Sequence, residues 1–145
     1  MRRRRKRPGA RDLEIRDTRD VPVRALRGLL ASAEWAAKRA TRDVARCIER
    51  TTVLLTGWHR GRCVAMVRIL SDGVFRALID DLVVHPAGRG RGWGRRLVEA
   101  ALAHPLLRDV EEVALSTVIP DFYKRWGFRR DPHAMKRRRG GPGVE

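Results

Sequence analysis

Residues 83–95 of this 145-residue chain read Val83-Val84-His85-Pro86-Ala87-Gly88-Arg89-Gly90-Arg91-Gly92-Trp93-Gly94-Arg95. An apolar strand runs into a glycine-rich turn, and apolar positions at helical spacing follow (Leu97, Val98, Ala101 and Leu102). Glycines let successive backbone N–H groups converge, and the helix adds its own unpaired N–H groups and the positive end of its dipole. The segment therefore predicts an anion site suited to a diphosphate.

The spacing of these glycines excludes two common phosphate motifs. In the registers that start at Gly88 and Gly90, GxGxxG fails because Trp93 and Arg95 occupy the third glycine position, and GxxxxGK fails at the same residues. The pattern that fits is Arg-x-x-Gly-x-Gly at Arg89, Gly92 and Gly94. An Arg-Gly loop on nucleic acid is the less favoured alternative, because such loops normally lie in low-complexity tails rather than between a strand and a helix.

Outward from this turn, hydrophobic periodicity predicts an α/β domain around a mixed sheet, in the order βααβββαβαββ. Asp20 is expected to cap the first helix with Pro22 in its first turn, and a second helix is expected from about Ala37 to Glu49. Further helices are expected from the glycine-rich turn to Pro105 and over 120–126, with Gly127 as a stop. The predicted strands are 13–16, 52–58, 63–70, 75–84 and 113–115, with a closing pair at 128–130 and 133–136.

The formal net charge of +16 favours an anionic partner. It divides into +6 for residues 1–12, +7 for 13–135 and +3 for 136–145. We therefore expect a disordered basic tail at 1–12, one domain at 13–136 and a flexible tail at 137–145. A hydrophobic fraction of 43% argues against a disordered polycation, and the short apolar runs argue against a membrane protein.

The cysteines, Cys47 and Cys63, form neither a disulfide scaffold nor a metal-binding pair, and no His/Cys/Asp cluster has metal-ligand spacing. No metal is therefore expected. The basic start is followed by Pro8-Gly9 and then by charges, so no secretory signal is indicated. A reduced cytoplasmic compartment is the expected location.

The Arg-x-x-Gly-x-Gly segment resembles the acetyl-CoA signature of the GNAT superfamily of N-acetyltransferases. Residues 122–128, Phe-Tyr-Lys-Arg-Trp-Gly-Phe, look like the second family hallmark, FYxxxGF. The resemblance covers roughly residues 64–136. Within it, the sequence is similar to small bacterial members of the family. It implies the GNAT fold, a mixed and mostly antiparallel sheet flanked by helices, and direct transfer of acetyl from acetyl-CoA to a primary amine.

The resemblance also implies site residues. A splayed strand would offer main-chain groups of Leu82, Val83 and Val84 to the pantetheine arm of acetyl-CoA, and Tyr123 would protonate the departing thiolate. The backbone of the turn would hold the pyrophosphate (Arg89, Gly90, Arg91, Gly92, Trp93, Gly94 and Arg95), although the family usually has a smaller aliphatic residue than Trp93.

The general base is open among Asp81, Asp80 and a chain of waters, and either aspartate could instead pair with an arginine. Successive strand residues face opposite sides, so one carboxylate is expected in the cleft and the other away from it. Glu34 and Trp35 lie where the family builds its acceptor groove; contact with substrate and a helix end with a buried tryptophan are equally open.

The acceptor, a small-molecule or peptide amine, is not identified by any motif, and the resemblance allows a homodimer. Two alternatives stay open: a basic nucleic-acid-binding protein on a GNAT scaffold, with nonspecific contacts through the tails, and a catalytically inactive CoA sensor.

Overall fold

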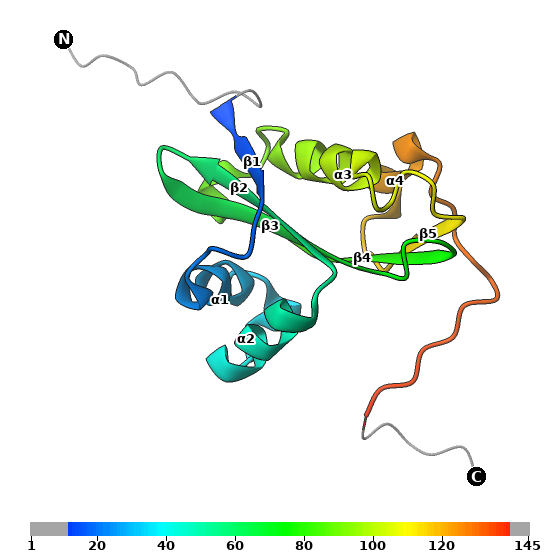
Figure 1. The fold of residues 1–145 in the computed structure, drawn as a ribbon, viewed down its shortest axis with the longest axis horizontal. Coiled ribbons are helices and arrows are strands. Elements are labelled where there is room, and N and C mark those ends of the chain that lie inside the picture. Colours follow the sequence, from blue (N-terminus) through cyan, green and yellow to red (C-terminus); the bar gives the residue numbers. More distant parts are fainter. Residues whose placement is uncertain (1–11, 140–145) are drawn as a thin grey trace. The chain divides into compact units, whose positions relative to one another are not determined.

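The computed structural model describes residues 12–139, which form two compact units that divide between Leu115 and Ser116. The first unit holds the sheet and most helices, and the second holds α4 (Pro120–Tyr123) and the 3₁₀ turn η4 (Lys124–Trp126) (Figure 1). The predicted tails lie largely outside the described residues; of the C-terminal one, residues 137–139 are described and exposed. The elements of the first unit are β1 (Glu14–Asp17), α1 (Val23–Ala31), η2 (Glu34–Ala36), α2 (Thr41–Arg50), β2 (Val53–His59), β3 (Arg62–Ser71), β4 (Arg76–Val84), η3 (Pro86–Gly88), α3 (Trp93–Ala103) and β5 (Glu112–Leu115).

The five strands form one sheet in chain order, β1-β2-β3-β4-β5. The first three pairings are antiparallel and β4–β5 is parallel, so the predicted mixed, mostly antiparallel sheet is confirmed. The β2–β3 hairpin turns through Arg60 (φ 50°) and Gly61 (φ 74°). A two-residue loop with both residues left-handed matches the twist of its strands, so this hairpin fixes the register.

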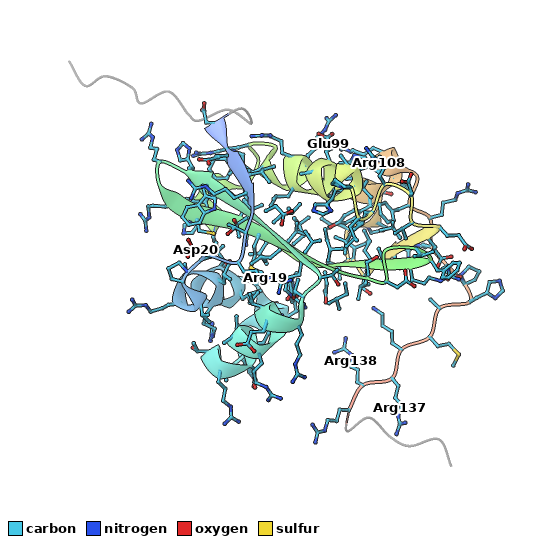
Figure 2. All side chains as sticks on the ribbon, in the orientation of Figure 1. Arg19, Asp20, Glu99, Arg108, Arg137 and Arg138 are labelled. Atoms are coloured by element: carbon cyan, nitrogen blue, oxygen red, sulfur yellow. The ribbon has the colours of Figure 1, made fainter. Side chains whose placement is uncertain are left out.

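Helices cover both faces of the sheet: α1 and α2 lie on one face and α3 on the other (Figure 1). Buried residues of α1 and α2 (Leu26, Leu29, Leu30, Val44 and Ile48) share a core with Leu54, Met66 and Val83 of the strands. The opposite helix buries Trp93, Leu97, Val98 and Ala101. Arg19, in the β1–α1 connection, donates hydrogen bonds to the carbonyl groups of Glu49, Thr51 and Thr52 and so holds the end of α2 (Figure 2).

Two helix starts differ from the sequence prediction. Pro22, not Asp20, is the N-cap of α1, and it makes no side-chain cap bond. The second helix begins at Thr41 rather than Ala37, because Ala40 is extended (ψ 146°). Residues 37–40 have good helix formers, but tertiary contacts override propensity here; the side chain of Arg39 reaches a buried carboxylate (below).

The closing strands predicted at 128–130 and 133–136 are absent from the described part of the second unit. A turn does form there, since Asp131 accepts hydrogen bonds from the N–H groups of His133 and Ala134. Apart from half-buried Phe128, the residues of the two segments are exposed, so they bury too little apolar surface to hold a strand pair. The predicted helix over 120–126 is present as α4 and η4, and it ends at left-handed Gly127 (φ 83°).

Candidate active site

The edge of β4 that faces away from β3 is paired with β5 over only about half of its length. The parallel pairing with β5 covers Arg76–Ile79 only, whereas β4 continues to Val84. In the chain from 12 to 139 no strand pairs with that edge over 80–84. The backbone groups of Leu82, Val83 and Val84 that point away from β3 are therefore available to an extended ligand. The resemblance implied that a splayed strand would offer these same main-chain groups.

A β-bulge interrupts β4 at the same place. Val83 pairs with Met66 and Asp80 pairs with Arg68, so two residues, Asp81 and Leu82, oppose the single residue between them. Asp81 is left-handed (φ 49°), a conformation that aspartate tolerates better than most residues. The bulge cancels the normal alternation of side chains. The expectation that Asp80 and Asp81 face opposite sides is thus wrong, because both carboxylates contact one arginine.

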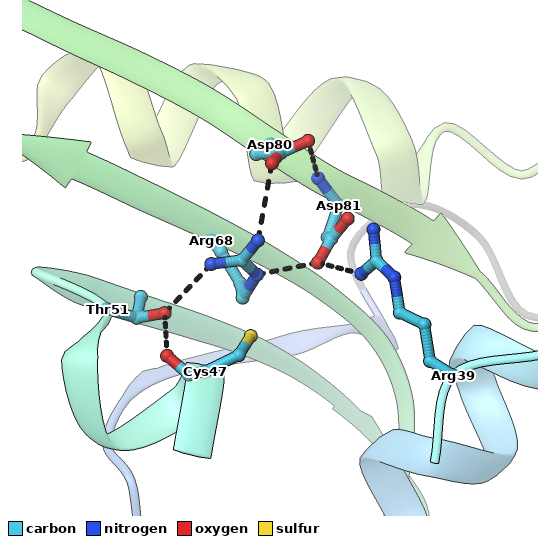
Figure 3. Close-up of polar contacts among 6 residues, drawn as sticks. All are labelled: Arg39, Cys47, Thr51, Arg68, Asp80 and Asp81. Carbon is cyan, nitrogen blue, oxygen red and sulfur yellow. Dashed lines mark hydrogen bonds and ion pairs between the residues drawn. The ribbon is translucent and has the colours of Figure 1, made fainter. Parts of the chain in front are cut away.

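That arginine is Arg68 of β3, which is buried (Figure 3). Its Nε donates to Asp81 Oδ2 (2.6 Å), its Nη2 to Asp80 Oδ2 (3.2 Å) and its Nη1 to Thr51 Oγ1 (3.1 Å). Asp80 Oδ1 accepts the backbone N–H of Asp81 (2.9 Å), which braces the bulge. Sequence reasoning missed Arg68; the signal was a single arginine in the otherwise apolar run Cys63–Leu70.

A second guanidinium reaches the buried carboxylate from the α1–α2 connection. Arg39 Nη1 donates to Asp81 Oδ2 (2.7 Å), so both arginines converge on one oxygen. Burial alone would lower the pKa of Arg39, but its hydrogen bond and attraction to Asp81 raise that pKa. Asp81 Oδ1 is buried and has no hydrogen-bond partner within the described part of the chain. The Asp80 side chain, by contrast, is 43% exposed. Each aspartate thus pairs with an arginine, and one buried oxygen stays available as an acceptor.

The chain passes from the open edge of β4 into the glycine-rich turn. His85 caps η3 by accepting the N–H of Ala87 (3.1 Å), and Gly90 (φ 77°) and Gly92 (φ 80°) are left-handed. Within the described chain, no acceptor meets the backbone N–H groups of Gly90, Arg91, Gly92, Gly94 and Arg95. Donors at a turn and a helix N-terminus suit a pyrophosphate.

Trp93 packs against Gly88, where any side chain larger than hydrogen would clash with the indole ring. Its side chain is buried, and a Cβ added at Gly88 would lie 2.2 Å from the ring carbon Cζ3. The ring also contacts His59, with centroids 5.3 Å apart, and Arg91 lies over it at 5.5 Å. The aromatic departure from the family pattern is therefore accommodated by packing under the turn.

Tyr123 belongs to the second unit and lies in an aromatic cluster. Its ring contacts Phe122, Trp126 and Phe128 with centroids 4.9, 6.1 and 5.9 Å apart. Burial raises the pKa of the Tyr123 hydroxyl. The group therefore keeps its proton at neutral pH, as a proton donor must.

Glu34 and Trp35 lie on η2, between α1 and α2. The alternative of a buried tryptophan is wrong, since Trp35 is 59% exposed. Its ring is covered in part by the guanidinium of Arg39, 5.4 Å from the ring centre. Trp35 is thus linked through Arg39 to Asp81. Glu34 is exposed and takes no part in this cluster.

Over residues 12–139, no group of three or more His, Cys, Asp or Glu side chains could hold a metal ion. Across the same residues, every helix is too short or too polar to span a membrane.

Comparison with known proteins identifies one family. Residues 49–130 match the profile of the acetyltransferase (GNAT) domain. An N-acetyltransferase of Porphyra purpurea is 27% identical over 137 residues, which is 87% of this chain and 75% of that protein. The histone acetyltransferase TAP1 of Glycine max is 28% identical over 130 residues; the match covers 81% of this chain but only 56% of TAP1. A Xanthomonas campestris structure assigned to the GNAT family superposes with a TM-score of 0.80 at 28% identity, over 89% of this chain and 94% of that one.

Proposed function

Because the chain belongs to the GNAT family of acetyltransferases, we propose that it transfers an acetyl group from acetyl-CoA to a primary amine. The chain is an acetyltransferase of the EC 2.3.1 class. Its donor, acceptor and catalytic residues are the proposal. One observation carries it: the edge of β4 that no strand of the described chain pairs over 80–84 leads directly into a turn where the N–H groups of Gly90, Arg91, Gly92, Gly94 and Arg95 meet no acceptor among residues 12–139.

The residues of this segment fit acetyl-CoA, which supplies an acetyl group activated as a thioester. Leu82, Val83 and Val84 would bind the pantetheine arm through their main chain. The N–H groups of Arg89–Arg95 would bind the pyrophosphate, with Trp93 packed beneath. A main-chain N–H at the β4 edge would polarise the acetyl carbonyl, as in an oxyanion hole.

Two proton transfers are assigned to side chains. The acceptor ammonium must lose a proton, and Asp80 or Asp81, directly or through water, takes it. Asp80 is the more accessible of the two, whereas Asp81 has the buried acceptor atom Oδ1. The departing sulfur must gain a proton, and Tyr123 donates it because burial keeps its hydroxyl neutral.

Calorimetric titration with acetyl-CoA tests donor binding, and release of free thiol in the presence of an amine panel tests transfer. We expect binding in the micromolar range and amine-dependent thiol release. Tyr123→Phe should bind acetyl-CoA like the parent protein but turn over about 10²-fold more slowly, a typical loss for a general acid. Equal turnover of the two proteins would remove Tyr123 from the mechanism.

The proposal also includes acceptor contacts by Glu34 and Trp35, a homodimer and a cytoplasmic location. Nucleic-acid contact through the basic tails involves residues that lie mostly outside the described chain. Comparing the full chain with residues 13–135 in a gel shift would assign any such binding to the tails.

A further inference from the structure

Two arginines hold Asp81 unequally: Arg39 from the α1–α2 connection and Arg68 from β3. Two guanidinium groups share Asp81 Oδ2, and like charges at one atom repel each other. Arg68 is held by three acceptors and its side chain is 9% exposed, whereas Arg39 has a single hydrogen-bonding carboxylate and is 37% exposed. Arg39 is therefore the partner that can leave.

Arg39 also has unused donors. A guanidinium carries five N–H groups, and only Nη1 of Arg39 makes a hydrogen bond within the described chain. The guanidinium lies beside the exposed ring of Trp35, which holds it at the surface without occupying its donors. A half-exposed guanidinium with free N–H groups fits a carboxylate or phosphate.

The carboxylate beneath Arg39 offers the opposite charge. Asp81 Oδ1 is buried and finds no hydrogen-bond partner among residues 12–139, on a side chain that is 0% exposed. A buried acceptor without a donor is costly, so the atom is suited to a donor that arrives with a ligand. An ammonium group is such a donor, because it carries three N–H groups and the charge opposite to that of the carboxylate. An ammonium can reach it only where Arg39 yields, since Arg39 contacts the same carboxylate.

We propose that the acceptor amine carries its own anionic group, and that Arg39 binds that anion while the ammonium of the same molecule binds Asp81. This inference rests on the proposed function and names the substrate class of its acceptor site. The anion replaces Asp81 as the partner of Arg39, so no charge is left unpaired. A simple amine or polyamine lacks this replacement, so its binding to Asp81 would leave Arg39 without an anionic partner.

Matched amines test the proposal. Each pair keeps the primary amine and removes the anion: amino acids against their carboxamides for a carboxylate, and O-phosphoethanolamine against ethanolamine for a phosphate. Thiol release gives kcat/KM for each amine, and the better pair identifies the anion. We expect the anionic member of at least one pair to be favoured by about 10-fold or more, the worth of a charged hydrogen bond.

Three variants separate recognition from structure. Arg39→Gln should abolish the preference for the anionic member, and Arg39→Lys should restore part of it. Arg42→Gln removes a neighbouring charge whose side chain is 87% exposed, and it should leave the preference unchanged. A merely structural role for Arg39 would lower kcat/KM for both members of a pair equally, and that result overturns the inference.

Two further outcomes also overturn it: a parent enzyme that favours the neutral members, and a panel in which no anionic amine is acetylated. Acetyl-CoA titration of the same samples keeps this failure distinct from failure of the proposed function. Donor binding without anion preference contradicts the acceptor class alone. Absence of donor binding contradicts the acetyltransfer site itself.

Discussion

Replacing Arg68 by glutamine should destabilise the domain through the buried carboxylate of Asp81. The substitution removes the 2.6 Å hydrogen bond to Asp81, the 3.2 Å bond to Asp80 and the 3.1 Å bond to Thr51. Asp81 keeps Arg39 as a counter-ion, whereas Asp80 is exposed enough to be solvated by water. The main cost is therefore a buried carboxylate with one guanidinium instead of two.

The magnitude follows from the burial of both partners. Breaking a buried ion pair by removing one member costs about 3–5 kcal/mol. Retention of Arg39 places Arg68→Gln near the lower end, at about 3 kcal/mol, which is roughly 10 °C in Tm for a domain of this size. Loss of the pair should also loosen the bulge at Asp81, so acetyl-CoA affinity should fall as well.

Urea unfolding followed by far-UV circular dichroism measures this free energy. Arg76→Gln is the matched control, because its side chain is 60% exposed and its ion pairs with Glu111 and Glu112 are surface pairs; it should cost under about 1 kcal/mol. A second variant, Asp81→Asn, removes the negative charge of the pair but keeps a residue that tolerates the left-handed backbone. A loss for Arg68→Gln no larger than that of the control would refute the view that the Arg68–Asp81 pair is buried and stabilising.

Three other perturbations test the turn and the aromatic cluster. Gly88→Ala should destabilise the protein by about 1–3 kcal/mol through overpacking, since its Cβ would lie 2.2 Å from the buried ring of Trp93; thermal melts measure this. Gly90→Ala has open space but a φ of +77°, so it should cost only about 1 kcal/mol of strain and mainly weaken acetyl-CoA binding, seen by calorimetry. Burial raises the pKa of Tyr123 above its ordinary value of about 10, so the neutral form is favoured in the folded state. The stability gained from it is present below pH 10 and lost as the pH rises through the folded pKa. Ultraviolet titration of this single tyrosine, compared with unfolding of Tyr123→Phe, checks the sign; a folded-state pKa at or below 10 contradicts it.

Local patterns predicted the parts of the fold that local physics decides. The strand ending at Val84, the left-handed glycines and the amphipathic helix after them are all encoded within residues 83–103, so their arrangement follows from spacing alone. Gly127 as a helix stop is a similar case. The local structure of the segment that we propose to bind the cofactor is therefore predictable from the sequence.

The acceptor side depends on contacts that the sequence does not display. Asp80 and Asp81 reach the same side because of a bulge, and a bulge is set by the register of β4 against β3. Arg68 and Arg39 meet Asp81 from 13 and 42 residues away. The late start of α2 has the same origin, because an ion pair competes with helix propensity. The closing strands failed for want of apolar residues to bury.

Turnover measured with acetyl-CoA labelled in the acetyl group is the most direct test of acetyl transfer at the edge of β4. Mass spectrometry of the amine panel should detect label on a primary amine, dependent on Tyr123 and on the N–H turn at 89–95. Transfer that survives disruption of the turn by Gly92→Pro, or tight acetyl-CoA binding with no labelled amine, would contradict an acetyltransferase site built from these residues.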